Sequence, residues 1–369
     1  MGASEASPAP GYSLLKLSSA EGPVYRPVKS QAVRDARPGE IPLIDVSGMF
    51  SESLPARRAV ADQIRHAATT IGFFYMSQHG IASTSIDAAA RSARDFFQQP
   101  AHKKEPLDSA RLKGYNGWKP PATQKISEGE SVDVRENFSI TYSPTYDDAT
   151  AGVARDQIPH EVARFLPAPE DELPWEKLAD LVGFELHVMN YWKSCLHLAR
   201  RLQRAFALSL SLDEDYFDSK TTFPDASLAL NYYPTIRASS AEGAEGDVSI
   251  GSHTDFQFFT ILWQDVVGGL QVLTPSGEWI RAAPIEGTLV VNIADYLMRI
   301  TNDRYMSTVH RARNTSGKER LSMAFFFGFN LNERCGVLPS CVDAEHPAKY
   351  DEISCEEWIR KRIEATYIK

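Results

Sequence analysis

The sequence predicts an α+β fold in which helices brace a small β-barrel or jelly roll. Residues 223–330 contain a close succession of short apolar segments separated by turns, which is the pattern that such a barrel requires. Residues 175–211 carry apolar side chains at helical spacing, which predicts a long helix against the outer face of the barrel. With 369 residues, 43% of them hydrophobic, the chain is long enough to bury a sizeable core.

The composition excludes several classes of protein. The formal net charge is −9, whereas a nucleic-acid surface would be basic. No stretch approaches the roughly eighteen apolar residues of a membrane span, and the first ten residues lack the basic and apolar regions of a secretory signal. The four cysteines show no CxxC spacing and are expected to be reduced thiols. We therefore expect a cytoplasmic protein without nucleic-acid or membrane partners.

The N-terminal third is expected to hold a loose arm followed by alternating strands and helices. Residues 1–38 are rich in Ala, Ser and Pro, which predicts an arm that is dispensable for the fold, although 12–17 and 24–28 could pack on the domain. A single domain is expected over 39–369. Its first elements, in order, are a strand at 41–46, a helix at 53–70, a strand at 72–76 and a helix at 83–98.

Two polar segments are expected to be loops. Residues 111–146 are polar and broken by Gly and Pro. Residues 238–247 contain only Ser, Ala, Glu, Gly and Asp and predict a flexible loop. The sequence Ser-Cys-Glu-Glu at 354–357 is a capping box and predicts a C-terminal helix over about 354–367.

The barrel strands follow from short apolar runs. Alternation over residues 223–233 places Asn231 and Tyr233 on the same face of the first strand. Further strands are expected at 258–263 and 288–293. Between them, residues 268–280 predict a hairpin around a Thr-Pro-Ser-Gly turn.

Three residues within this β-rich region form a candidate metal site. His253 and Asp255 are two positions apart, which places both side chains on one face of a β-strand. His310 comes much later in the chain and must return from another strand. Two imidazoles and one carboxylate on one side of a metal are typical of non-haem Fe(II) oxygenases, where the remaining positions are open for cosubstrate, O2 and water. Zinc sites usually keep only one open position.

Several motifs together resemble one known family. The region is similar to the double-stranded β-helix (jelly roll) of the 2-oxoglutarate/Fe(II)-dependent dioxygenases, in the branch that resembles isopenicillin N synthase. The motifs that carry the resemblance are the iron motif at His253, Asp255 and His310, an Arg-x-Ser motif at 320–322, Asn-Tyr-Tyr-Pro at 231–234, Gly-Leu-Gln-Val at 269–272 and Asn-Asp-Arg-Tyr at 302–305. The whole chain is also similar to fungal oxygenases of specialised metabolism.

The resemblance implies the cofactors and the roles of particular residues. It implies Fe(II), 2-oxoglutarate and O2, with Arg320 and Ser322 holding the remote carboxylate of 2-oxoglutarate. Arg suits this role because its planar guanidinium can hold a carboxylate through two parallel bonds. Tyr233 and Asn231 are implied as further cosubstrate contacts. The implied reaction is decarboxylation of 2-oxoglutarate to succinate, coupled to oxidation of a small organic molecule by hydroxylation, desaturation or ring modification.

The alternation of side chains along a strand predicts which residues contact the substrate. Because Arg320 and Ser322 are expected to face inward, Phe326 on the same strand should do so as well, with Phe256 on another side of the pocket. The family resemblance implies in addition that residues 111–146 lie over the mouth of the barrel, where substrate contacts concentrate.

Three other functions are compatible with parts of the sequence. An oxidase of the isopenicillin N synthase type would use the same triad without 2-oxoglutarate. A catalytically inactive binding or sensor protein would use the fold to hold a small ligand. A cupin-type metalloprotein would bind other metals.

Overall fold

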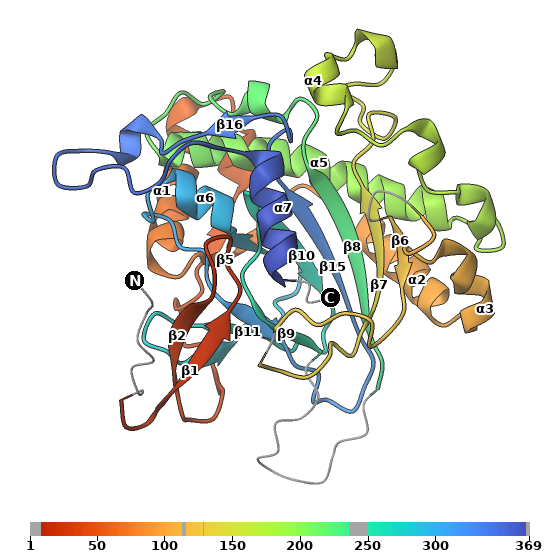
Figure 1. The fold of residues 1–369 in the computed structure, drawn as a ribbon, viewed down its shortest axis with the longest axis horizontal. Coiled ribbons are helices and arrows are strands. Elements are labelled where there is room, and N and C mark those ends of the chain that lie inside the picture. Colours follow the sequence, from red (N-terminus) through yellow and green to blue (C-terminus); the bar gives the residue numbers. More distant parts are fainter. Residues whose placement is uncertain (1–8, 113–115, 128, 236–248, 367–369) are drawn as a thin grey trace.

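Two main β-sheets, two small two-stranded sheets and a layer of helices make up the computed structural model, which describes residues 9–112, 116–127, 129–235 and 249–366 (Figure 1). The larger sheet has eight strands, in the spatial order β4 (Leu43–Asp45), β5 (Phe73–Ser77), β13 (Leu289–Ile293), β10 (Phe259–Gln264), β15 (Arg320–Phe327), β8 (Ala226–Tyr233), β7 (Glu136–Thr141) and β6 (Gly117–Lys119). The smaller sheet has five strands, β3 (Arg34–Asp35), β12 (Trp279–Arg281), β11 (Leu270–Leu273), β14 (His310–Ala312) and β9 (Ile250–His253). The α+β class that the sequence predicts is therefore confirmed.

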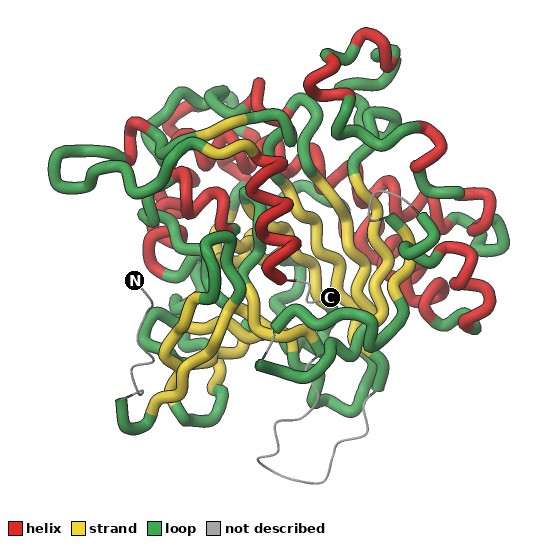
Figure 2. The backbone as a smooth tube through the Cα atoms, viewed as in Figure 1, coloured by secondary structure: helices red, strands yellow, loops and turns green. Residues whose placement is uncertain are grey.

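Three long helices cover one face of the large sheet (Figures 1 and 2). They are α1 (Leu54–Thr70), α2 (Ser83–Phe97) and α5 (Phe184–Ser209), and the shorter helices are α3 (Ala101–Lys104), α4 (His160–Ala163), α6 (Asp295–Ile300) and α7 (Cys355–Thr366). Alternate residues of β15 point toward the long helices, and the ring of Phe325 lies 5.8 Å from that of Trp192 on α5. The other face of β15 is thereby left for the site.

The long helix α5 begins later than the sequence predicts. Residues 175–178 form only a short 3-10 turn, and Gly183 has a φ of +79°, a conformation that a helix cannot continue through. Two of the apolar residues near this glycine do not join the predicted apolar face: Val182 is 94% exposed and Leu186 is 61% exposed. Helical periodicity alone did not reveal the break, because the apolar spacing runs through Gly183 without interruption.

Most of the N-terminal arm is folded, and the two segments that the sequence left able to pack on the domain, 12–17 and 24–28, both form strands. Strands β1 (Tyr12–Leu17) and β2 (Val24–Lys29) form a hairpin, and β3 joins the small sheet beside β12. Leu17 and Val28 are buried against residues of the small sheet. Composition predicted a loose arm because its few apolar residues are scattered, but these two suffice to dock the hairpin.

The remaining elements agree with the sequence to within a few residues. The hairpin of β11 and β12 and the strands β4, β5, β8, β10 and β13 all form where expected. Helix α7 is capped by Ser354, whose hydroxyl accepts a hydrogen bond of 3.2 Å from the Glu357 N–H. The strand directly before α7, β17 (Ile353–Ser354), pairs with β16 (Arg334–Cys335). The predicted loop at 238–247 lies outside the described residues. None of the helices in the described ranges has the length and apolar character that crossing a bilayer requires.

Candidate metal and cosubstrate site

The two sheets bring His253, Asp255 and His310 together. His253 is the last residue of β9 and His310 is the first residue of β14, and the two face each other across the antiparallel pair. Asp255 lies two residues beyond the end of β9, so the prediction that it shares a strand with His253 was wrong. The chain turns after His253 and brings the carboxylate close to both imidazoles.

The distances within this triad fit a single metal ion. The Nε2 atoms of His253 and His310 lie 3.7 and 3.8 Å from Asp255 Oδ1, and one ligand atom from each residue lies within 4.8 Å of the others. Two imidazoles and a carboxylate form a donor set that suits Fe(II), and all three donors come from one side. The residues present therefore fit the iron that the sequence motifs imply.

Hydrogen bonds orient both imidazoles so that Nε2 is free. His253 Nδ1 lies 2.7 Å from the Gly251 carbonyl, and His310 Nδ1 lies 3.1 Å from the Thr308 carbonyl. A carbonyl can only accept, so each Nδ1 carries the proton and each Nε2 keeps its lone pair for a metal. Burial, together with the neighbouring His310, lowers the pKa of His253 to about 3, which keeps this imidazole neutral.

Two side chains that sequence reasoning missed hold the carboxylate of Asp255. Thr260 Oγ1 and Asn292 Nδ2 donate to Asp255 Oδ2 at 2.5 and 2.7 Å, which leaves Oδ1 facing the histidines. Burial acts to raise the pKa of Asp255, but the two histidines and these two bonds outweigh it and hold the pKa below its usual range. Both partners lie on strands beside each other in the large sheet, where alternation could have placed them on the inner face.

Arg320 lies in a buried pocket of polar side chains at one end of the cavity. Its side chain donates to the Gly268 carbonyl and to Ser322 Oγ, the latter at 3.4 Å, and its guanidinium stacks on the ring of Tyr233 at 4.5 Å. The Tyr233 hydroxyl lies 3.5 Å from Ser322 Oγ. A guanidinium flanked by two hydroxyls is a suitable site for a carboxylate.

One cavity of about 750 Å³ contains all the predicted site residues. Its wall includes the triad, Arg320, Ser322, Tyr233, Asn231, Phe256 and Phe326. On β15, Arg320, Ser322, Ala324 and Phe326 all line the cavity, as strand parity predicts. The volume suits a cosubstrate together with a small organic molecule.

The segment predicted to cover the barrel mouth instead extends the large sheet and lines the cavity. Strand β7 pairs with β8, and Asn137 donates to Asn231 Oδ1 at 3.0 Å. Arg135 also donates to Asn231 Oδ1, and Lys119 on β6 lines the same wall. Burial and the nearby Arg135 lower the pKa of Lys119 to about 8. Sequence reasoning did not identify these cations, because the positions of β6 and β7 in the sheet cannot be inferred from their short lengths.

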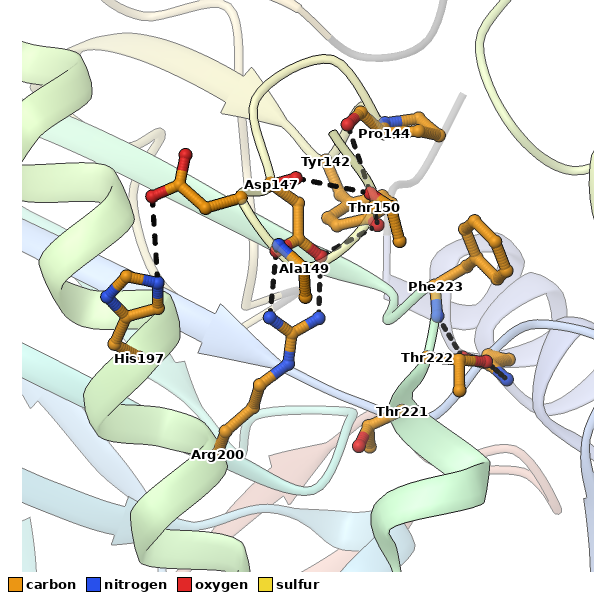
Figure 3. Close-up of polar contacts among 12 residues, drawn as sticks. Tyr142, Pro144, Asp147, Ala149, Thr150, His197, Arg200, Thr221, Thr222 and Phe223 are labelled. Atoms are coloured by element: carbon orange, nitrogen blue, oxygen red, sulfur yellow. Dashed lines mark hydrogen bonds and ion pairs between the residues drawn. The ribbon is translucent and has the colours of Figure 1, made fainter. Parts of the chain in front are cut away.

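An ion pair fixes the loop that follows β7 to the long helix α5 (Figure 3). Arg200 donates to both carboxylate oxygens of Asp147 at 2.8 and 2.6 Å, and the Tyr142 hydroxyl donates to the same carboxylate at 3.0 Å. Burial acts to raise the pKa of Asp147, but these bonds and the Ala149 N–H hold it below its ordinary value. Since Tyr142 lines the cavity, the ion pair positions part of its wall.

The donor set of the triad and the buried guanidinium in the same cavity are the features expected of a non-haem iron oxygenase. Comparisons with known proteins agree with this class. The model of the 2OG-Fe(II) oxygenase superfamily matches residues 224–329, and the model named "non-haem dioxygenase in morphine synthesis N-terminal" matches residues 41–161. The chain is 49% identical to the 2-oxoglutarate-Fe(II) type oxidoreductase ppzC of Metarhizium rileyi, over 96% of this chain and 95% of that protein.

More distant relatives are also similar along most of the chain. The 2-oxoglutarate-Fe(II) type oxidoreductase hxnY of Emericella nidulans is 31% identical over 88% of this chain and 90% of that protein. The crystal structure of a full-length Neurospora crassa protein in complex with alpha-KG and thymine has a TM-score of 0.76 and 28% identity, covering 90% of this chain and 99% of that one. The chain belongs to the 2-oxoglutarate-Fe(II) oxygenase superfamily, and the resemblance found in the sequence is confirmed. It is an oxidoreductase that uses Fe(II), 2-oxoglutarate and O2 to oxidise a small molecule.

Proposed function

We propose that His253, Asp255 and His310 hold the catalytic Fe(II), and that Arg320, Ser322, Tyr233 and Asn231 hold 2-oxoglutarate beside it. The observation that carries the proposal is the orientation of the triad, in which two Nε2 lone pairs and Asp255 Oδ1 converge from one side. Further support comes from Arg320, which presents its guanidinium within the same cavity. Phe256 and Phe326 are proposed to contact the organic substrate.

Each residue has a role that follows from its contacts. Thr260 and Asn292 keep Asp255 ionised and aimed at the metal, and the carbonyls of Gly251 and Thr308 keep the imidazoles in the right tautomer. When bound, Fe(II) with 2-oxoglutarate and O2 supplies an oxidant that removes hydrogen from a C–H bond while 2-oxoglutarate is converted to succinate and CO2.

The fold and the cellular setting complete the proposal. We propose that the two sheets, over about residues 223–330, form a double-stranded β-helix within one domain that covers 39–369. Support comes from the cavity, whose lining residues are drawn from both sheets. The four cysteines are free and buried, in keeping with a reducing cytoplasm. A role in fungal specialised metabolism, with a small-molecule substrate and no nucleic-acid or membrane partner, is the setting that we propose.

Oxygen uptake measured with and without 2-oxoglutarate tests the proposed function. The Fe(II)-loaded protein should consume O2 only when 2-oxoglutarate is present, and succinate should form in step with it. The protein freed of metal serves as the control and should show neither. Oxygen uptake on an organic substrate without 2-oxoglutarate would instead assign the chain to the oxidases of the isopenicillin N synthase type. No uptake under any condition, with an intact metal site, would indicate a binding protein.

A further inference from the structure

The cavity contains a second carboxylate, Asp225, that the proposed reaction does not use. Along β8, Tyr233, Asn231, Ala229 and Ser227 line the cavity at alternate positions, and Asp225 continues this series just before the strand begins. Asp225 and Asp255 are the two acidic residues among the described residues of the wall. Since Asp255 belongs to the triad, Asp225 is the acid that remains for another ligand.

No cation within the described residues neutralises Asp225. Its one side-chain partner is Gln257, whose Nε2 donates both to the carboxylate and, at 3.0 Å, to the Asp225 carbonyl. Burial raises the pKa of Asp225 to about 6, and the bond from Gln257 offsets this only in part. A carboxylate in such surroundings gains strongly from a positive partner, because burying an unpaired charge is unfavourable.

The surroundings of Asp225 differ in polarity from those of Arg320. Phe223, two residues before Asp225, and Phe326, opposite Ser227, are apolar residues of the cavity wall near Asp225, and Leu331, Ile359 and Ile363 line the same cavity. At the other end of β8 lie three cations, Arg320, Lys119 and Arg135. Arg320 pairs with Tyr233 in the strand register, and Arg135 donates to Asn231. Lys119 pairs with Asn137, which in turn pairs with Asn231. The cavity therefore runs from a cationic end to an acidic end.

Backbone hydrogen bonds hold Asp225 in place. The Asp225 N–H donates to the Phe329 carbonyl at 3.1 Å, and the Phe223 N–H donates to Asn330 Oδ1 at 2.7 Å, a bond that Figure 3 shows beside Thr222. Gly328 lies against the pair of Asp225 and Gln257, where an added Cβ would come within 3.1 Å of Gln257 Cβ and 3.3 Å of the Asp225 carbonyl oxygen. The carboxylate is thus presented from a fixed scaffold, as a binding group requires.

The strand register gives the separation between Asp225 and the triad. Thr260, which bonds to Asp255, lies opposite Phe326, and Phe326 lies opposite Ser227. Two strand spacings across the sheet and two residues along β8 separate Thr260 from Asp225, which corresponds to roughly 12 Å between Cα atoms. A substrate contacting both places would span on the order of 10 Å.

We propose that Asp225 is a substrate-binding residue that selects a small organic substrate carrying a protonated amine, at a distance of roughly 10 Å from the carbon that is oxidised. The amine would donate to the Asp225 carboxylate, and the apolar residues of the wall would enclose the hydrocarbon between the amine and the oxidised carbon. This inference rests on the proposed function, because it takes the triad as the place of oxidation.

Two probes test the inference; they share a hydrocarbon part and differ in the terminal group, a protonated amine in one and a neutral hydroxyl in the other. The full-length protein, loaded with Fe(II) and 2-oxoglutarate under anaerobic conditions, is titrated by calorimetry with phenylbutylamine and with phenylbutanol. The wild-type protein should bind the amine at least about tenfold more tightly than the alcohol, and Asp225→Asn should remove this preference by weakening the amine alone. Glu333→Gln serves as the matched control, because Glu333 is paired with Lys220 and lies outside the cavity wall.

The outcomes separate this inference from the proposed function. Equal affinities of the wild-type protein for amine and alcohol would overturn the role of Asp225, as would an equal loss of both probes in Asp225→Asn. If that variant does not fold, the wild-type comparison still decides the question. Succinate formation by the wild-type protein without any probe reports on the Fe(II) and 2-oxoglutarate chemistry alone, so a failure of the proposed function would be visible independently.

Discussion

The two ends of the cavity are built in different ways. Arg320 and the two histidines of the triad lie on β9, β14 and β15, where strand register fixes which side chains face one another. Asp225 lies in the segment before β8, and residues of α7 and of the loop after α4, which come from distant parts of the chain, line the same cavity. Strand register can fix the positions of the groups that all members of the family need for the reaction. Loops and terminal helices can vary in sequence, and the substrates that they contact can vary with them.

Removing the carboxylate of the triad should have the largest effect. Asp255→Ala should reduce succinate formation below detection and reduce bound iron from one equivalent to nearly none, because two imidazoles alone hold the ion weakly. Metal analysis and turnover on the same sample measure both. Asp148→Ala, which removes an exposed Asp on the loop held by α5, should change neither. One equivalent of iron and normal turnover in Asp255→Ala would disprove the assignment.

Breaking the ion pair between the loop and α5 should mainly reduce stability. Arg200→Met leaves the fully buried carboxylate of Asp147 without its cation, which should lower the free energy of unfolding by about 3 kcal/mol in a urea titration. Arg204→Met, on the same helix, disrupts the more exposed pair with Asp218 and should cost less than about 1 kcal/mol. Equal losses in the two variants would show that burial of Asp147 does not set the strength of the pair.

The N-terminal hairpin offers a matched pair of leucines. Leu17→Ala removes a side chain that is 8% exposed and packed on the small sheet, and it should lower the free energy of unfolding by about 2 kcal/mol. Leu14→Ala, at a position that is 41% exposed, should change it by less than about 0.5 kcal/mol. Thermal or urea unfolding gives both values, and an unchanged stability in Leu17→Ala would restore the view of this segment as a loose arm.

Asp225 should lower stability at neutral pH, and the effect should depend on pH. Because its pKa in the folded protein, about 6, lies above its ordinary value, the folded state holds the proton more tightly, and wild-type stability falls as pH rises from about 4 to above 6. Asp225→Asn should therefore be more stable than the wild type by about 2–3 kcal/mol at pH 8 and nearly equal to it at pH 4. Urea titrations at the two pH values test this, and a difference that grows toward low pH would contradict burial of the carboxylate as the cause.

The positions of Arg320, Ser322 and the two histidines of the triad were largely predictable from the sequence. Periodicity of two placed Arg320, Ser322 and Phe326 on one face of β15, and the structure has them there. The same rule failed for Asp255, because β9 ends at His253 and a rule about strands does not show where a strand ends. Thr260 and Asn292 were missed because their role depends on a contact with Asp255, which is a property of the folded chain.

The acidic end was not predictable, for a physical reason. Asp225 is a lone carboxylate just before a strand, and its significance comes from the apolar side chains and the absent cation around it in the described structure. The wall of the same cavity includes residues of α7 and of the region of α4, which are distant in the sequence from Asp225. The break of α5 at Gly183 was missed for a related reason, since a single glycine inside an apolar pattern does not by itself indicate a left-handed conformation.

The affinity of Arg320 variants for 2-oxoglutarate tests the central claim, that this end of the cavity holds the cosubstrate. Arg320→Ala removes a charge-assisted contact worth about 1.5–3 kcal/mol and should weaken apparent 2-oxoglutarate binding by about ten- to a hundredfold, with Arg320→Lys in between. Bound iron, measured on the same samples, should remain at one equivalent because Arg320 is not a ligand. Wild-type affinity for 2-oxoglutarate in Arg320→Ala, or a raised KM for the organic substrate alone, would contradict the account.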